Sequence, residues 1–169
     1  MRFYLIGFMG SGKSHWASKW SERFDFEFHD LDKTIESLEK KSVGELFETK
    51  GEEWFRQMES EVLRDMNRFD NCIISCGGGT PCYLNNMEWM NQNGFSIYLN
   101  AKPEFIFENI IEEKNSRPLI KDIAEGDLHD FIKKKLEERK PFYEKAKLKL
   151  DVTGLSDKTF GNILNSLNK

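Results

Sequence analysis

The segment Gly7-Phe8-Met9-Gly10-Ser11-Gly12-Lys13-Ser14 decides the fold of this 169-residue chain. It fits the pattern Gly-x-x-x-x-Gly-Lys-Ser/Thr, and an apolar run precedes it while helical spacing follows it. Glycines in such a turn let backbone N–H groups and the N-terminus of the next helix face phosphate groups. The sequence therefore predicts a phosphate-binding loop, in which Lys13 reaches the outer phosphates of a nucleoside triphosphate and Ser14 binds Mg²⁺.

Short apolar segments recur along the chain and are separated by stretches with helical spacing. Their almost continuous apolar character is typical of strands that are covered on both faces. Strands joined by helical crossovers form a mostly parallel sheet with right-handed connections. We therefore predict a three-layer α/β/α sandwich whose five strands lie at Arg2 to Ile6, Phe26 to Leu31, Cys72 to Cys76, Phe95 to Leu99 and Leu148 to Val152.

Several helix ends can be located from capping residues. Ser42 and Glu45 have the spacing of a capping box, in which each residue satisfies a backbone N–H of the other. Gly51 is expected to end that helix before a new one begins. Three further helices are expected to begin at or near Pro103, Asp127 and Ser156.

Composition limits the kinds of partner. Lys and Arg total 25 against 29 Asp and Glu, so the net charge of −4 provides no general attraction for nucleic acid or anionic lipid. The length suits one domain over residues 1–169, and no signal peptide or membrane-spanning run is present, so we expect a cytoplasmic monomer. Cys72, Cys76 and Cys82 form no Cys-x-x-Cys pair, which disfavours a disulfide framework or a zinc site.

Acidic residues and glycines follow the second and third predicted strands. Ligands gather at the carboxyl ends of parallel strands, so these positions are candidates for a site. Asp30 and Asp32 are expected to end the second strand at alternate positions, with both side chains directed toward Mg²⁺ or an acceptor hydroxyl. A helix cap at Asp32 is the ordinary alternative. Gly77–Gly79 follow the third strand and either let a ligand approach the backbone closely or form a plain tight turn.

Arginines at three positions suit the binding of anions. Arg56 lies three residues before Glu59 on a helix, where a simple salt bridge is common, yet a guanidinium on a largely buried helix usually holds a specific anion. The stretch Glu112 to Asp127 has little helical patterning. We expect it to form a mobile lid that carries Arg117 and excludes water. Arg139 lies near a helix end, where a surface charge is the ordinary alternative.

Taken in order, these motifs resemble those of the shikimate kinases, small members of the nucleoside-monophosphate-kinase-like P-loop enzymes. The resemblance runs almost end to end through six motifs: Leu-Ile-Gly-Phe-Met-Gly-Ser-Gly-Lys-Ser at 5–14, Asp30-Leu31-Asp32, Phe55-Arg56-x-x-Glu59, Gly77-Gly78-Gly79, Arg117-Pro118-Leu119 and Arg139-x-Pro141-x-Tyr143-x-x-Ala146. It implies strand order 2-3-1-4-5, a substrate-binding region at about 32–61 and a lid at about 112–127. It also implies ATP-dependent phosphorylation of the 3-hydroxyl of shikimate, a step of chorismate and aromatic amino acid biosynthesis.

The resemblance assigns roles to the matching residues. Asp32 would bind the hydroxyls of the acceptor and act as a base, while Gly78 and Gly79 would shape the pocket. Arg56 and Arg139 would bind the acceptor carboxylate, because the forked geometry of a guanidinium group matches the two oxygens of a carboxylate. Charge on the transferred phosphoryl group would be stabilised by Lys13 and Arg117.

The nucleotide and the metal would be held at the edge of the loop. Mg²⁺ would be bound by Ser14 and Asp30, with support from Ser75. The phosphates of ATP would contact the residues Gly10, Ser11, Gly12, Lys13, Ser14 and His15, together with Arg117. Many family members also carry an arginine just before the lid that packs on adenine, whereas this chain has Ile110-Ile111-Glu112-Glu113-Lys114. We expect Arg117 and the segment Asp151 to Gly154 to contact adenine instead.

Two other functions share part of this pattern. A gluconate kinase or a nucleoside monophosphate kinase would have the same loop, sheet and lid, but would explain the triple glycine and the two carboxylate-binding arginines less well. A catalytically silent homologue that uses nucleotide binding as a switch is the alternative outside enzymes. The presence of Lys13, Asp32 and Arg117 argues against such a switch.

Overall fold

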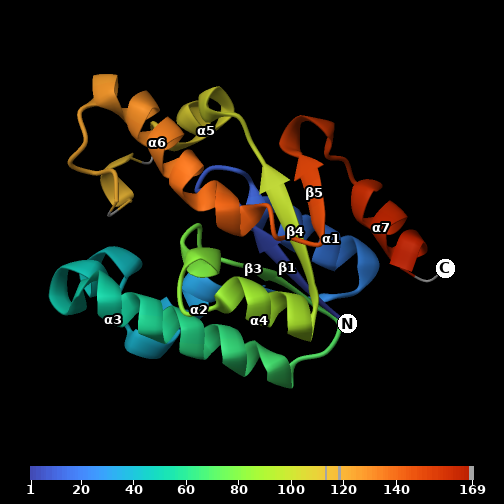
Figure 1. Cartoon of the computed structure of the whole chain (residues 1–169). Coiled ribbons are helices and arrows are strands. Elements are labelled where there is room, and N and C mark those ends of the chain that lie inside the picture. The colour runs from blue at the N-terminus through green and yellow to red at the C-terminus, as the bar shows by residue number, and fades with distance from the viewer. Residues whose placement is uncertain (113, 118, 168–169) are drawn as a thin grey trace.

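The computed structural model describes residues 1–112, 114–117 and 119–167. Its strands pair in parallel into one five-stranded sheet of order β2-β3-β1-β4-β5, which confirms the order implied by the resemblance (Figure 1). The strands are β1 Arg2–Ile6, β2 Glu27–Asp30, β3 Cys72–Ser75, β4 Phe95–Asn100 and β5 Leu148–Asp151. Each lies within two residues of its predicted bounds.

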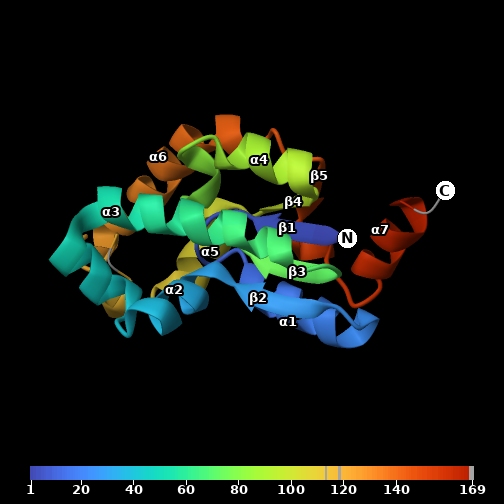
Figure 2. The same ribbon diagram turned by 90° about the horizontal axis from the view of Figure 1, so that it is seen from below.

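Helices connect the strands and cover both faces of the sheet. They are α1 Lys13–Phe24, α2 Leu31–Glu39, α3 Val43–Asp65, α4 Asn86–Asn93, α5 Pro103–Ile110, α6 Glu125–Tyr143 and α7 Thr159–Leu167, and the 3₁₀ turns are η1 Met66–Arg68, η2 Thr80–Cys82, η3 Lys114–Ser116 and η4 Val152–Gly154. Figure 2 shows α3 and α4 on the opposite side of the sheet from α1. No helix of the described part of the chain has both the length and the apolar character that crossing a membrane requires.

Capping residues locate some helix ends and not others. The capping box is confirmed, because Ser42 Oγ accepts from the N–H of Glu45 and Glu45 Oε2 accepts from the N–H of Ser42. Gly51 interrupts α3 with a left-handed φ of 84°, as predicted. Pro103 occupies the first turn of α5, also as predicted.

Two predicted helix starts are wrong. Helix α6 begins at Glu125 after Ala124, so Asp127 lies in the first turn, where its charge faces the positive helix end without capping it. Helix α7 begins at Thr159 rather than at Ser156, because a turn at 157–158 separates them. The N–H of Ser156 instead donates to Thr159 Oγ1.

The register of the central strands brings three segments to one edge of the sheet. Ser75 of β3 lies beside Leu5 of β1 on one side and beside Asp30 of β2 on the other. The N–H of Cys76 continues the pairing by donating to the carbonyl of Leu5 at 3.0 Å. The loop after β1, the end of β2 and the glycines after β3 therefore emerge in one row.

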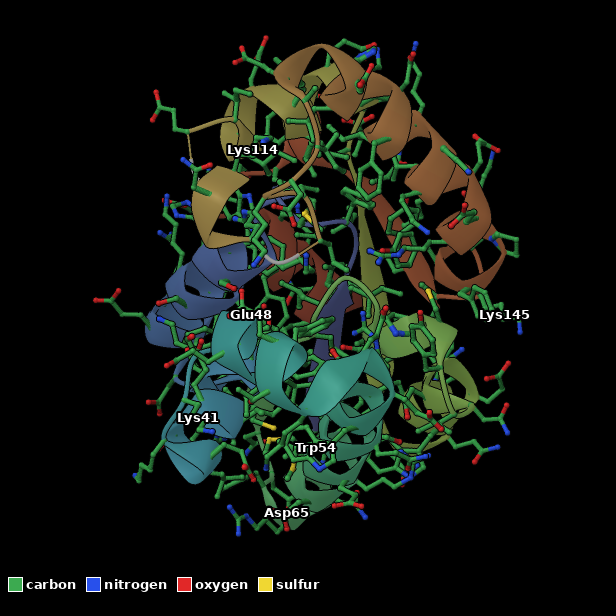
Figure 3. All side chains as sticks on the ribbon, turned by 90° about the vertical axis from the view of Figure 1, so that its left-hand side faces the viewer. Lys41, Glu48, Trp54, Asp65, Lys114 and Lys145 are labelled. Atoms are coloured by element: carbon green, nitrogen blue, oxygen red, sulfur yellow. The ribbon has the colours of Figure 1, made fainter. Side chains whose placement is uncertain are left out.

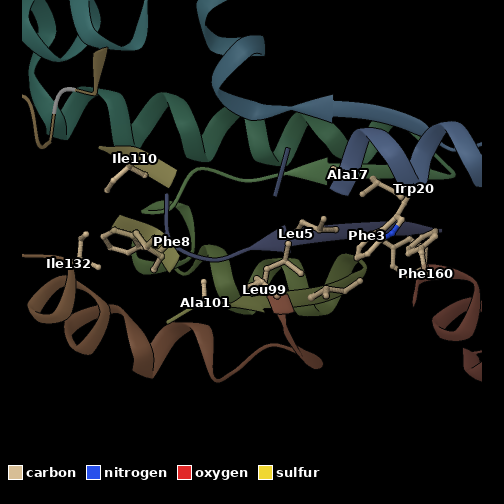
Figure 4. Packing of buried hydrophobic residues seen from close by; sticks show 14 of the residues in the cluster. Phe3, Leu5, Phe8, Ala17, Trp20, Leu99, Ala101, Ile110, Ile132 and Phe160 are labelled. Carbon is tan, nitrogen blue, oxygen red and sulfur yellow. The ribbon is translucent and has the colours of Figure 1, made fainter. Parts of the chain in front are cut away.

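Side chains of β1 alternate between two hydrophobic clusters. Phe3 and Leu5 pack on the side of α1, while Tyr4 and Ile6 pack on the side of α3 and α4. Phe160 of α7 sits in the first cluster, stacked on Trp20 at 5.4 Å between ring centroids and edge-on to Phe3 at 4.8 Å (Figure 4). Phe160 is fully buried, so this ring fastens α7 to the sheet.

We predict that Phe160→Ala lowers the free energy of unfolding by about 3–5 kcal/mol, because the substitution leaves a cavity among packed rings. Urea unfolding followed by circular dichroism measures the change. Leu38→Ala is the control, since Leu38 is 62% exposed, and its effect should stay within about 0.5 kcal/mol. Equal losses in the two variants would contradict this role for Phe160.

Candidate functional site

The Gly7–Ser14 loop wraps around a buried lysine. Gly12 caps α1 with a left-handed φ of 86°, and a Cβ on Gly10 would lie 2.5 Å from Ile110, so both positions favour glycine. Lys13 is 8% exposed, and its ammonium donates to the carbonyl of Phe8 at 2.8 Å. Burial lowers the pKa of Lys13 to about 8, because the charged form is poorly solvated there.

Hydroxyl and carboxylate oxygens from three elements meet beside this loop. Ser14 Oγ of α1 donates to Asp30 Oδ2 at 2.6 Å and lies 3.0 Å from Ser75 Oγ at the end of β3. The three predicted metal-site residues are thus brought together. No group of three or more His, Cys, Asp or Glu side chains with metal-binding geometry occurs among the described residues.

Asp32 is not a strand residue, which corrects the expected alternation with Asp30. Strand β2 ends at Asp30, whose side chain accepts from the N–H of Lys33 and caps α2. Asp32 therefore lies in the first turn of α2, and the cap that the sequence offered for Asp32 belongs to Asp30. Burial raises the pKa of Asp32 to about 7, with further contributions from the carboxylates of Glu59 and Asp30.

A cavity of about 180 Å³ opens next to Asp32, and we call it the arginine cavity. A cavity of roughly 150 Å³ can hold a benzene molecule, so this one has room for a small ring. Its charged lining residues are Asp32, Arg56, Glu59, Arg117 and Arg139. The apolar side chains in its lining are Met9, Val43, Phe47, Phe55 and Leu119.

A second cavity, which we call the loop cavity, lies along the Gly7–Ser14 loop. It is lined by Gly10, Gly12, Lys13, Ser14, His15, Asp30, Ser75 and Asn109, among others. Ser11 is not among its lining residues, because its side chain is buried and its N–H donates to Phe8 O. The two cavities share five lining residues: Met9, Asp32, Gly77, Gly78 and Arg117.

Arg56 forms the salt bridge that was its ordinary alternative and also lines the arginine cavity. Its Nη1 donates to Glu59 Oε2 at 2.9 Å, and its Nη2 donates to Glu52 Oε1 at 3.0 Å. Glu59 is completely buried and also accepts from Thr80 Oγ1. The guanidinium is therefore held in place from both sides.

Arg139 is a buried group, so its interpretation as a surface charge is wrong. It is 8% exposed, its guanidinium carbon lies 5.2 Å from the ring centre of Phe8, and its Nη1 has no hydrogen-bond partner among the described residues. Helix α6 continues through Pro141 to Tyr143, whose hydroxyl donates to Gly78 O at 2.6 Å. This bond ties the helix that carries Arg139 to the glycine segment.

The three glycines after β3 are packed against the charged side chains of the arginine cavity. A Cβ on Gly79 would lie 2.6 Å from the guanidinium of Arg56, and one on Gly78 would lie 3.1 Å from Arg139 Nη1. A Cβ on Gly77 would collide with Glu59. A plain tight turn does not account for these contacts, so the segment is a wall of the cavity made of backbone.

The expected lid contributes Arg117 and Leu119 to the arginine cavity. Pro118 of the Arg117-Pro118-Leu119 motif lies outside the described residues. Lys121 forms an ion pair with Glu48 of α3, and Figure 3 shows Glu48 near the segment that carries Lys114. Only part of 112–127 is irregular, because η3 and the first turn of α6 lie within it.

Two residues at the cavities were not predicted from the sequence, one that lines the loop cavity and one that pairs with Arg56. Asn109 lines the loop cavity and donates to Gly10 O at 2.8 Å, but a single Asn at the end of a helix carries no sequence signal. Glu52 could have been found from its i,i+4 spacing to Arg56. The segment Asp151–Gly154, expected near adenine, is not among the lining residues of either cavity.

Comparison with known proteins gives consistent results. A family model described as shikimate kinase matches residues 9–168. A shikimate kinase of Bacteroides thetaiotaomicron is 38% identical over 158 residues, which cover 94% of this chain and 90% of the relative. A solved shikimate kinase structure from that species has a TM-score of 0.89 at 36% identity, over 99% of this chain and 97% of that one. Another, from Acinetobacter baumannii in complex with shikimate, has a TM-score of 0.87 at 27% identity, over 98% and 91%.

We predict that Asp32→Asn stabilises the protein at high pH. Burial raises the pKa of Asp32 in the folded chain to about 7, above its ordinary value of 3.8. The stability that this carboxyl contributes is complete below its unfolded pKa and is lost as pH rises through its folded pKa. Asn cannot ionise, so the variant should gain about 1–3 kcal/mol relative to the native protein between about pH 5 and pH 8.

Urea unfolding at the two pH values, without Mg²⁺ or nucleotide, measures this difference. Asp25→Asn provides a control for the change of side chain, because Asp25 is exposed. If the difference in unfolding free energy between the variant and the native protein does not change with pH, the pKa of Asp32 is not raised in the folded chain.

Proposed function

This chain belongs to the shikimate kinase family, and we propose that it transfers the terminal phosphoryl group of ATP to the 3-hydroxyl of shikimate. The product would be shikimate 3-phosphate, in a step of aromatic amino acid biosynthesis. One observation carries the proposal. Asp32 lines the loop cavity and the arginine cavity at once, so a nucleotide in one and an acid in the other would meet at its carboxylate.

Asp32 is our candidate for the general base. A base works best when its pKa lies near the working pH, and burial raises the pKa of Asp32 to about 7. The carboxylate would accept the proton of the acceptor hydroxyl as that oxygen attacks phosphorus. Its place on a helix rather than on a loop supports accurate positioning.

Lys13 and Arg117 are our candidates for stabilising the transferred phosphoryl group. Phosphoryl transfer depends mainly on positioning and on fixed positive charge, because negative charge is spread over the phosphoryl oxygens. Lys13 lines the loop cavity, and Arg117 lines both cavities. Lys13 now bonds a carbonyl of its own loop, and a phosphate would offer its ammonium a stronger, charged acceptor.

We propose that Mg²⁺ is held by Ser14 and Asp30, with Ser75 beside them. The residues fit such an ion, because Ser14 Oγ lies 2.6 Å from Asp30 Oδ2 and 3.0 Å from Ser75 Oγ, and magnesium prefers oxygen ligands. The absence of a larger acidic cluster among the described residues agrees with a metal that is completed by phosphate oxygens and water. When bound, the ion would neutralise charge on the phosphates.

The arginine cavity suits a small ring that carries a carboxylate. Arg56 and Arg139 provide the cationic groups, Gly78 and Gly79 form a close backbone wall, and Leu119 of the lid adds apolar cover. A closed lid would exclude water, which would otherwise accept the phosphoryl group.

We further propose that residues 1–169 act as one domain, a cytoplasmic monomer without nucleic-acid or membrane partners, in line with the net charge of −4.

We predict that ADP release by the purified protein depends on shikimate and on Mg²⁺. A coupled assay for ADP measures the rate, and a panel of gluconate and nucleoside monophosphates tests the related kinases. Asp32→Asn should keep nucleotide binding but lose turnover by roughly 100- to 10,000-fold, because the base is removed. Lack of stimulation by shikimate would overturn the proposal. Measurable turnover by the protein would exclude a catalytically silent homologue that uses nucleotide binding as a switch.

We predict that Ser14→Ala raises the Mg²⁺ concentration needed for half-maximal activity by about 10-fold or more, since it removes a ligand of the ion. A titration of Mg²⁺ at saturating ATP and shikimate measures this. Ser18→Ala is the matched control, because Ser18 is exposed on the same helix. An unchanged Mg²⁺ requirement in Ser14→Ala would remove Ser14 from the metal site.

A further inference from the structure

The two buried arginines of the arginine cavity differ in how their charge is compensated. Both are less than a tenth exposed and both line the cavity. Arg56 is paired with two carboxylates, whereas no carboxylate of the described residues forms an ion pair with Arg139. The family resemblance treats them alike, so this asymmetry needs its own explanation.

Arg56 is enclosed on several sides. Its Nε and Nη2 donate to Glu52 Oε1 at 3.3 and 3.0 Å, and its Nη1 donates to Glu59. The ring of Tyr83 lies 4.7 Å from the guanidinium carbon, and the Tyr83 hydroxyl donates to Glu52 Oε1 at 3.4 Å. Two carboxylates on one guanidinium leave this cluster with a net negative charge.

Arg139 presents the opposite situation. Its Nη1 is buried beside Gly78 without a hydrogen-bond partner among the described residues. The neighbours of the guanidinium are uncharged, namely the ring of Phe8 at 5.2 Å and the hydroxyl of Tyr143. A buried cation without a counter-ion is costly, and the arrival of an anion relieves that cost. An anionic ligand in this cavity would supply the counter-ion that Arg139 lacks, whereas Arg56 already has two.

We propose that Glu52 sets the acceptor affinity of this site by neutralising Arg56, so that Arg139 provides most of the attraction for the acceptor carboxylate. The inference rests on the proposed function and refines it. Glu52 acts as a positioning residue, because it holds Arg56 in place while reducing the pull of its charge. Arg56 then orients the acid through its remaining N–H groups.

Glu52 is the part of the cluster that can be altered without reshaping the cavity. Its side chain is 47% exposed and does not line the cavity, whereas Glu59 is completely buried against the glycine wall. Glu52→Gln keeps an oxygen that accepts from Arg56 and removes one negative charge. Water screens an exposed charge, so the change in acceptor affinity should be roughly 2- to 10-fold.

Glu52→Gln is expected to bind shikimate more tightly, with a fall of roughly 2- to 10-fold in both Kd by calorimetry and KM, and a smaller change in kcat. Glu53→Gln is the matched control, because Glu53 is exposed on the same helix and neither lines the cavity nor pairs with Arg56. An analogue of shikimate with a hydroxymethyl group in place of the carboxylate should show no gain. A gain for the analogue as well would overturn the electrostatic explanation.

Two arginine variants complete the test. Arg139→Leu should raise the Kd for shikimate more than Arg56→Leu does. Glu52→Gln should have a smaller effect on affinity in the Arg56→Leu background, because an exposed Glu52 without its partner is screened by water. Unchanged or weaker binding in Glu52→Gln, or an equal loss in the two arginine variants, would overturn the inference. A protein that neither binds nor phosphorylates shikimate would instead refute the proposed function.

Discussion

The parallel register of β2, β3 and β1 is the constraint on which the site depends. Leu5, Ser75 and Asp30 lie in one row across the sheet. The glycine loop, the start of α2 and the glycine segment 77–79 all begin within two residues of this row. A shift of one residue in any pairing would turn these groups to the other face of the sheet. The strand register therefore sets the positions of Lys13, Asp30 and Asp32, which lie just after β1 or at the end of β2.

Features set by local sequence pattern could be predicted, whereas features set by packing between distant segments could not. The phosphate-binding loop, the five strands and the capping box are local features, so their residues were sufficient to predict them. The order of the strands came from the resemblance alone, because apolar runs do not say which strands are neighbours. Asp32 was misplaced because Asp30 both ends β2 and caps α2. The burial of Arg139 depends on how α6 crosses the glycines, which no local pattern records.

Several ionisable groups in the site are buried, so their charged forms are poorly solvated. Asp32 has a raised pKa, Lys13 has a lowered one, and Arg139 is buried with an unsatisfied nitrogen. Such groups reduce the stability of the empty protein and gain most when ligands arrive. The two hydrophobic clusters on the faces of the sheet, with their stacked rings around Phe160, provide the stability that tolerates them.

The wall formed by Gly77–Gly79 also has an evolutionary consequence. Any Cβ there meets a charged group of the cavity, so these positions offer selection almost no variation with which to change the shape of the acceptor. Other parts of the lining consist of the ordinary side chains Val43, Phe47 and Leu119, which can be exchanged for smaller or larger ones. Descendants that acquire a different substrate should therefore differ on the helix and lid side, while the backbone side is inherited unchanged.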